Sequence, residues 1–152
     1  MLIGVFVCIG FMLAVLYIDL MFDVTAVPYR RSGTALPRDV LVPIAHYYGR
    51  ITQNPYVLMF VMLTTSVCLI AEVVYDLVPR WAGYSSLFLM GLAMVAGTVK
   101  VIPTAQRLAS GKDPEDVQTT LVHNMFPFHI LLFICILLLA AIQLSTAGTA
   151  NP

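Results

Sequence analysis

Four long runs of apolar residues, separated by shorter stretches rich in polar and charged residues, dominate the pattern along this chain. Each run has the roughly 20 residues that an α-helix needs to cross the hydrocarbon core of a bilayer. The runs extend from Leu2 to Phe22, Pro55 to Tyr75, Ala82 to Ile102 and Met125 to Leu144. The pattern predicts an all-α membrane protein with four transmembrane helices in an up-down bundle. This single domain covers residues 1–144, and a flexible tail is expected at 145–152.

The connection between the first two runs has its own helical pattern. Over residues 36–52 the apolar side chains fall mainly on one face: Leu41, Ile44, Ala45 and Tyr48. This spacing predicts a short interfacial helix. Pro43 and Pro55 argue against one unbroken rod that continues into the second transmembrane helix. Pro114 suits the first turn of a helix, so the last helix is expected to begin near it, and Pro127 to kink it.

Composition agrees with membrane insertion. The chain is 60% hydrophobic and 11% charged, and its mean hydropathy is +0.91. Ordinary soluble domains have about 25% charged residues. The formal net charge is zero, so nothing in the overall charge predicts binding to nucleic acid.

The distribution of lysine and arginine predicts the orientation. With four crossings, seven of the eight basic residues lie on or near one surface, and Arg80 alone lies on the other. By the positive-inside rule, both termini face away from the cytoplasm, or from the matrix of a mitochondrial inner membrane. The membrane is therefore expected to be either a bacterial cytoplasmic membrane or a mitochondrial inner membrane. Four of these residues form a moderate cluster that could bind phospholipid headgroups: Arg30, Arg31, Arg38 and Arg50.

Ionisable residues inside the apolar runs are costly and usually form pairs or line wet cavities. The first run ends in "YIDLMFD", with Asp19 and Asp23 one helical turn apart. By topology, Lys100 and His129 lie at a similar depth near the same surface, and Glu72 lies near the opposite one. An ion pair between Asp19 and Lys100 is the predicted contact. These ionisable residues form a predicted charge network with two possible roles. The network fixes only the register and topology of the helices, or it lines a ligand or redox pocket.

Small residues predict where helices approach closely. Gly10 with Ala14, and Ala93 with Gly97, form two small-x-x-x-small pairs that would let the first and third transmembrane helices pack together. Asp19 points away from the Gly10 face of its helix. Since a bundle buries one stripe of each helix, the other stripe is expected to meet a partner protein, a specific lipid or a wet pocket.

Residues that could hold a metal or a cofactor are few. The three cysteines are far apart, and the three histidines, at positions 46, 123 and 129, have no shared-face spacing. The sequence therefore predicts no metal site and no cofactor, although a haem held across helices, or a quinone, stays as an alternative. No recognised catalytic or nucleotide-binding motif occurs.

The size, the order of four helices, and the segments "LYIDLMFD" and "YYGRIT" together resemble small membrane proteins of the anthrone-oxygenase-like group. The resemblance covers most of the chain. It implies a cofactor-independent, oxygenase-like activity on an aromatic polyketide, and it assigns no catalytic residue here.

Two functions are consistent with these patterns. The first is a non-catalytic integral subunit of a larger membrane assembly, such as a respiratory or related bioenergetic complex, whose partners are lipids and other membrane subunits. The small extramembrane mass favours it. The alternative is a small membrane oxidoreductase or oxygenase-like protein with a ligand pocket near Asp19, Lys100 and His129.

Overall fold

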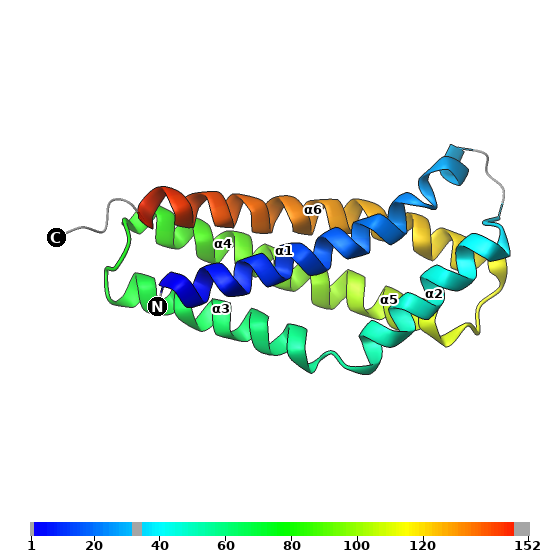
Figure 1. The fold of residues 1–152 in the computed structure, drawn as a ribbon, viewed down its shortest axis with the longest axis horizontal. Coiled ribbons are helices and arrows are strands. Elements are labelled where there is room, and N and C mark those ends of the chain that lie inside the picture. The colour runs from blue at the N-terminus through cyan, green and yellow to red at the C-terminus, as the bar shows by residue number, and fades with distance from the viewer. Residues whose placement is uncertain (1, 32–34, 148–152) are drawn as a thin grey trace.

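The computed structural model describes residues 2–31 and 35–147, and within these ranges the chain forms helices and no strand (Figure 1). The all-α prediction is confirmed. The elements, in chain order, are α1 (Leu2–Val24), the 3-10 helix η1 (Val27–Arg31), α2 (Arg38–Gln53), α3 (Tyr56–Val74), α4 (Arg80–Ala96), the π-helix η2 (Gly97–Val101), α5 (Ile102–Ser110) and α6 (Glu115–Ala147).

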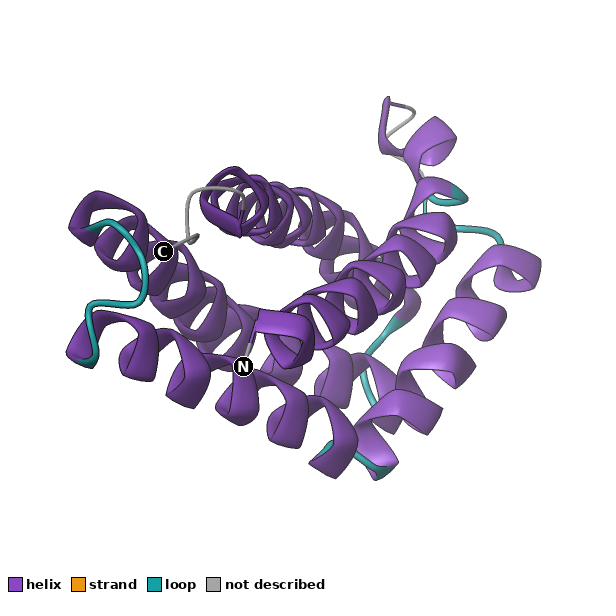
Figure 2. Ribbon diagram, turned by 60° about the vertical axis from the view of Figure 1, so that its left-hand side comes forward, coloured by secondary structure: helices purple, strands orange, loops and turns teal. Residues whose placement is uncertain are grey.

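Four long helices form the body of the molecule. Both α1 and α4 pack against α3 and α6, so the four surround one core (Figures 1 and 2). Four helical segments are long and apolar enough to cross a membrane: Ile3–Val24, Tyr56–Val74, Arg80–Ser110 and Glu115–Ala147. Buried apolar side chains from all four helices fill this core, among them Ile9, Leu69, Met90 and Leu139.

The last helix is longer than its apolar run. It begins at Glu115, near the expected start at Pro114, and continues through Pro127 to Ala147. The prediction of a flexible tail from residue 145 is therefore wrong for residues 145–147, and residues 148–152 lie outside the described part. The helix continues because Thr146 is buried and its hydroxyl donates to helix carbonyls, so packing extends past the apolar run.

A tight connection joins α3 to α4. Asp76 has a φ of 49°, and the Leu77 amide donates to the Glu72 carbonyl over 2.9 Å, which is the pattern of a helix ending in a left-handed residue. Gly83 then lies so close to α3 that a Cβ atom there would be 2.6 Å from Val73 Cγ2. The absence of a side chain at Gly83 therefore permits the close packing of α3 and α4.

A π-helix interrupts the third long segment. Here the Ile102 amide donates to the Gly97 carbonyl, five residues back. Pro103 follows directly, and proline has no amide hydrogen for the α-helical ladder. The chain accommodates this proline with one wider turn and continues as α5.

A second, smaller core lies at the end of the molecule where α2 packs against α5, on the right of Figure 1. The predicted buried face of α2 is confirmed, because Leu41, Ile44 and Tyr48 are buried there. Pro43 lies inside the helix without ending it, and Asn54 separates α2 from α3.

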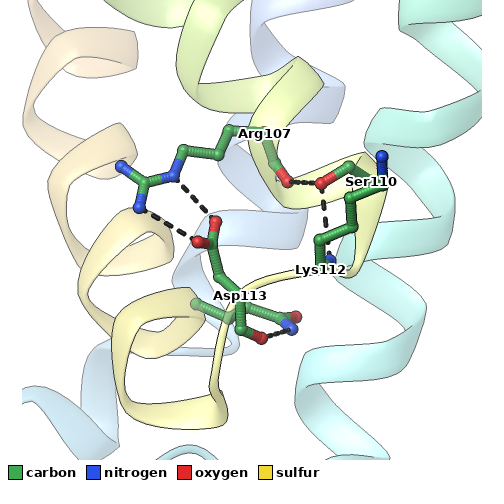
Figure 3. A network of polar contacts seen from close by, with 5 residues as sticks. Arg107, Ser110, Lys112 and Asp113 are labelled. Atoms are coloured by element: carbon green, nitrogen blue, oxygen red, sulfur yellow. Dashed lines mark hydrogen bonds and ion pairs between the residues drawn. The ribbon is translucent and has the colours of Figure 1, made fainter.

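The turn between α5 and α6 is held by polar contacts (Figure 3). The Arg107 guanidinium donates to both carboxylate oxygens of Asp113, over 2.7 and 3.0 Å. These hydrogen bonds from Arg107 hold the pKa of Asp113 below its usual value. Gly111 makes the turn with a φ of 61°, a conformation that suits glycine.

Candidate functional site

A buried carboxylate and imidazole meet between α1 and α6. Asp23 Oδ2 lies 2.5 Å from His129 Nδ1, and both side chains are about 1% exposed or less. The Tyr48 hydroxyl of α2 donates to Asp23 Oδ1 over 2.7 Å. Both oxygens of Asp23 therefore have a partner, and the carboxylate fixes the orientation of the histidine ring.

A second carboxylate lies one helical turn away. The Tyr47 hydroxyl donates to Asp19 Oδ1 over 2.8 Å, and the Tyr47 ring stacks on Phe22 with 4.0 Å between centroids. Burial, together with the neighbouring carboxylates, raises the pKa of both Tyr47 and Tyr48 far above the usual tyrosine value. Both tyrosines are therefore neutral donors, and α2 is joined to α1 by two hydroxyl-to-carboxylate bonds.

The position of both carboxylates follows from helical spacing. Val5, Ile9 and Met12 face the core from α1, and Asp19 and Asp23 continue the same face at seven and eleven residues after Met12. The "YIDLMFD" segment is therefore the polar end of the helix's packing face.

A cavity of about 90 Å³ lies beside this site, among the four long helices. Asp19 and His129 contribute its ionisable groups, and most other lining residues are apolar, including Met12, Met62, Met90, Leu132 and Ile136. The π-helix η2 contributes Gly97, Thr98 and Val101 to the wall.

One nitrogen of His129 is left without a partner. His129 Nε2 is buried and makes no hydrogen bond within the described residues, as is also true of His123 Nε2 and Gln143 Oε1. The two ring nitrogens lie on different edges of an imidazole, so Nδ1 faces Asp23 while His129 also borders the cavity. Buried polar atoms usually have partners, so a residue that borders the cavity and carries an unpaired ring nitrogen is the main chemical feature of this site.

No protein-family model, curated protein or solved structure matches the chain. The resemblance to the anthrone-oxygenase-like group is therefore neither supported nor contradicted by these comparisons. Function has to be argued from the geometry of the site.

The structure contradicts the predicted pair of Asp19 with Lys100. Asp19 binds Tyr47, whereas Lys100 is exposed and forms no ion pair within the part of the chain described. Lys100 lines a different hollow, which includes Thr104 and Asn124. On an undisturbed α-helix Lys100 would share the face of buried Ala93, seven residues earlier. The π-turn breaks that register and carries Lys100 away from the core.

Glu72 belongs to a different polar cluster. It is buried near the other end of the long helices, where Gln143 Nε2 donates to it over 2.9 Å. The prediction that Glu72 lies apart from Asp19 and His129 agrees with this placement.

The small-residue pairs do not mediate the helix contact they predicted. Gly10 and Ala14 are exposed, and a Cβ atom at Gly10 would have no neighbour within 4 Å. Ala93 is buried in the core, but Gly97 likewise has open space around its Cα. The acidic stripe of α1 is thus the internal one, and the Gly10 stripe faces outward.

Only some of the clustered arginines are available to bind a lipid headgroup. Arg30, Arg38 and Arg50 are exposed, and the side chain of Arg31 lies outside the described part. Arg38 pairs with Glu115 of α6 over 2.6 Å. Arg50 and His46 line a hollow of about 810 Å³ between α2 and α5. Headgroup binding therefore remains a proposal for Arg30, Arg50 and the less available Arg38.

The side chains that could bind a metal ion are histidine, cysteine, aspartate and glutamate. The described residues contain no group of three or more histidine, cysteine or acidic side chains that could hold a metal ion. The cysteines are free thiols, with Cys135 buried and Cys8 and Cys68 half-buried.

Sequence reasoning missed the two tyrosines of this site. Tyr47 and Tyr48 lie outside the apolar runs, so a search for ionisable residues at membrane depth did not include them. A signal existed, because Tyr48 lies on the predicted apolar face of α2, and a tyrosine buried there needs a partner for its hydroxyl.

Proposed function

We propose that the chain is an integral membrane protein that binds a small apolar molecule bearing a hydroxyl group and accepts a proton from it at His129. One observation carries this proposal. His129 borders an apolar cavity, its Nε2 is buried without a hydrogen-bond partner, and its Nδ1 is held by Asp23. Apolar pockets with a few well-placed polar groups are typical of ligand sites.

The hydrogen bonds define the proton transfer. A neutral His129 that donates Nδ1–H to Asp23 has a lone pair on Nε2. The hydroxyl of a bound molecule would donate to this lone pair. On transfer, the O–H bond breaks, its electron pair stays on the ligand oxygen, and the proton binds Nε2. Asp23 then stabilises the imidazolium, as an orienting carboxylate does for a general base.

The cavity limits the ligand. About 90 Å³ is well below the several hundred Å³ typical of pockets that enclose a whole drug-sized molecule. We therefore propose that the polar end of the ligand enters the cavity and that its apolar remainder lies between helices. An aromatic hydroxyl compound fits this description, and the resemblance to the anthrone-oxygenase-like group also implies an aromatic substrate.

The test uses 4-nitrophenol, whose phenolate absorbs at longer wavelength than the phenol. Protein in detergent should shift the absorption of the probe toward the phenolate band, relative to the same detergent without protein. His129→Leu should abolish this shift, and His46→Leu, at an exposed position of α2, should leave it intact. Equal spectra with wild type, His129→Leu and empty micelles would exclude His129 as the proton acceptor.

The non-catalytic subunit is the second candidate, and the outward face of α1 favours it. The exposed Gly10 and Ala14, one helical turn apart, leave a shallow strip to which another helix could pack closely. Gly10→Leu and Ala14→Leu should then release the chain from a large complex on a native gel without lowering its thermal stability. Migration of the gently extracted wild type as a small species would count against this role.

We further propose that the four long helices cross the membrane in alternate directions, with both termini away from the cytoplasm or matrix. Cysteine labelling in a background without Cys8, Cys68 and Cys135 should then reach positions 30–50 and 105–118 from the basic side. Labelling of Ser145 from that same side would contradict four crossings.

A further inference from the structure

A second buried polar cluster lies far from the His129 cavity along the helices. Glu72 of α3, Ser86 of α4 and Gln143 of α6 are each at most 2% exposed. Gln143 Nε2 donates to Glu72 Oε2 over 2.9 Å and lies 3.2 Å from Ser86 Oγ. Three helices thus bring three oxygen-bearing side chains to one buried point.

The cluster lacks a balancing positive charge. Within the described residues, Glu72 forms no ion pair, and the nearest cation along the chain, Arg80, pairs with exposed Asp76. A buried carboxylate without a cationic partner is strongly disfavoured unless it takes up a proton or a cation.

The amide of Gln143 provides an unused ligand. Its carbonyl oxygen Oε1 is fully buried and accepts no hydrogen bond from the described residues. Since the oxygen and nitrogen of one amide are about 2.3 Å apart, Oε1 lies within about 5 Å of Glu72 Oε2. A half-turn of the amide would place Oε1 where Nε2 now lies, 2.9 and 3.2 Å from the oxygens of Glu72 and Ser86.

We propose that Glu72, Ser86 and Gln143 form a binding site for a small monovalent cation, with Na⁺ as its ligand. With the Gln143 amide turned by this half-turn, the three side chains present oxygen atoms, which suits a hard cation, and a metal-to-oxygen distance of about 2.4 Å matches oxygens at these separations. One carboxylate with two neutral ligands balances a single positive charge and leaves a divalent ion undercompensated. The close packing at Gly83, one turn before Ser86, brings α4 near enough to complete the site.

The test is thermal unfolding of the purified protein in detergent, with NaCl replaced stepwise by choline chloride at constant ionic strength. The melting temperature should rise saturably with Na⁺ and much less with K⁺. Glu72→Gln should abolish the Na⁺ dependence, and Asp76→Asn, which changes an exposed acid one turn later, should retain it.

Equal melting curves in Na⁺, K⁺ and choline would overturn the proposal. Should Glu72→Gln not fold, Ser86→Ala provides the second variant, because loss of one neutral ligand should shift the Na⁺ dependence to higher concentration. An unchanged dependence in Ser86→Ala would contradict the site.

Discussion

Asp23 and His129 are 106 residues apart in the chain, yet Asp23 Oδ2 and His129 Nδ1 lie 2.5 Å from each other in a buried site. The contact joins α1 to α6, and Tyr48 adds α2 through the second carboxylate oxygen. One side chain thus connects three helices, so its replacement should affect both the site and the stability of the fold.

Asp23→Asn tests this contact. An asparagine side chain keeps one oxygen for the Tyr48 hydroxyl, but its amide nitrogen can only donate to His129 Nδ1, so the charge-assisted hydrogen bond between the Asp23 carboxylate and the histidine would be lost. We expect a loss of about 2 kcal/mol in the free energy of unfolding. Chemical denaturation in mixed micelles measures it. Asp39→Asn, at an exposed position of α2, is the matched control and should change the free energy by less than about 0.5 kcal/mol.

Alkaline titration tests Tyr47, which is half-buried, and Tyr48, which is buried. Their raised pKa values mean that the folded protein keeps protons that the unfolded chain releases above about pH 10. Stability from this source is therefore complete below about pH 10 and falls as the pH rises further. Replacing Tyr47 and Tyr48 together by phenylalanine should therefore leave the tyrosinate absorbance of the folded protein unchanged until the protein unfolds.

The absence of an Asp19 to Lys100 pair has a measurable consequence. Lys100→Met removes an exposed charge and should change the free energy of unfolding by less than about 0.5 kcal/mol. Its effect should add to that of Asp19→Asn. By contrast, Asp19→Asn and Tyr47→Phe should not be additive, because these residues share a hydrogen bond. A measurable coupling energy between positions 19 and 100 in the double-mutant cycle would show that the two side chains interact, and would contradict this prediction.

Gly83→Ala tests the close packing of α3 and α4. The new Cβ would lie 2.6 Å from Val73 Cγ2, so one helix must shift, at a cost of about 1–3 kcal/mol. Gly91→Ala is the control in the same helix. It has open space and gains helix propensity, so it should be neutral or stabilising. Val73→Ala should rescue Gly83→Ala, and failure of this rescue would place the strain elsewhere.

Much of the fold could be predicted from the sequence because its main determinant is local. An apolar run long enough to span a bilayer forms a helix whatever its neighbours are, and the periodic face of α2 identified Leu41, Ile44 and Tyr48 as buried. The start of α6 near Pro114 was predicted from local signals, whereas its C-terminal end was placed too early. Hydropathy marks the apolar part of a helix and does not show that Thr146, which lies beyond that part, is buried by the fold.

The site was only partly predictable, because depth in a membrane does not determine direction around a helix. Asp19, Asp23 and His129 were selected by depth and do meet in space. Lys100 was selected by the same reasoning and does not, since the π-turn at Gly97–Val101 changes the register. Ser86 and Gln143 carry no charge, so a search for ionisable groups did not find them.

The uninterrupted helix α6 fixes the distance between the two buried polar clusters. His129 and Gln143 are 14 positions apart on this helix, with no glycine or proline between them, which corresponds to about 21 Å along the axis. A hydrocarbon layer is about 30 Å thick, so a centred helix would hold each polar cluster less than one helical turn below its surface. Thinning of the bilayer by a few ångströms would bring both clusters to the interface together, and thickening would bury both. In a bilayer, the spacing of these two side chains would make the hydration of both polar clusters depend on the thickness of the surrounding lipid.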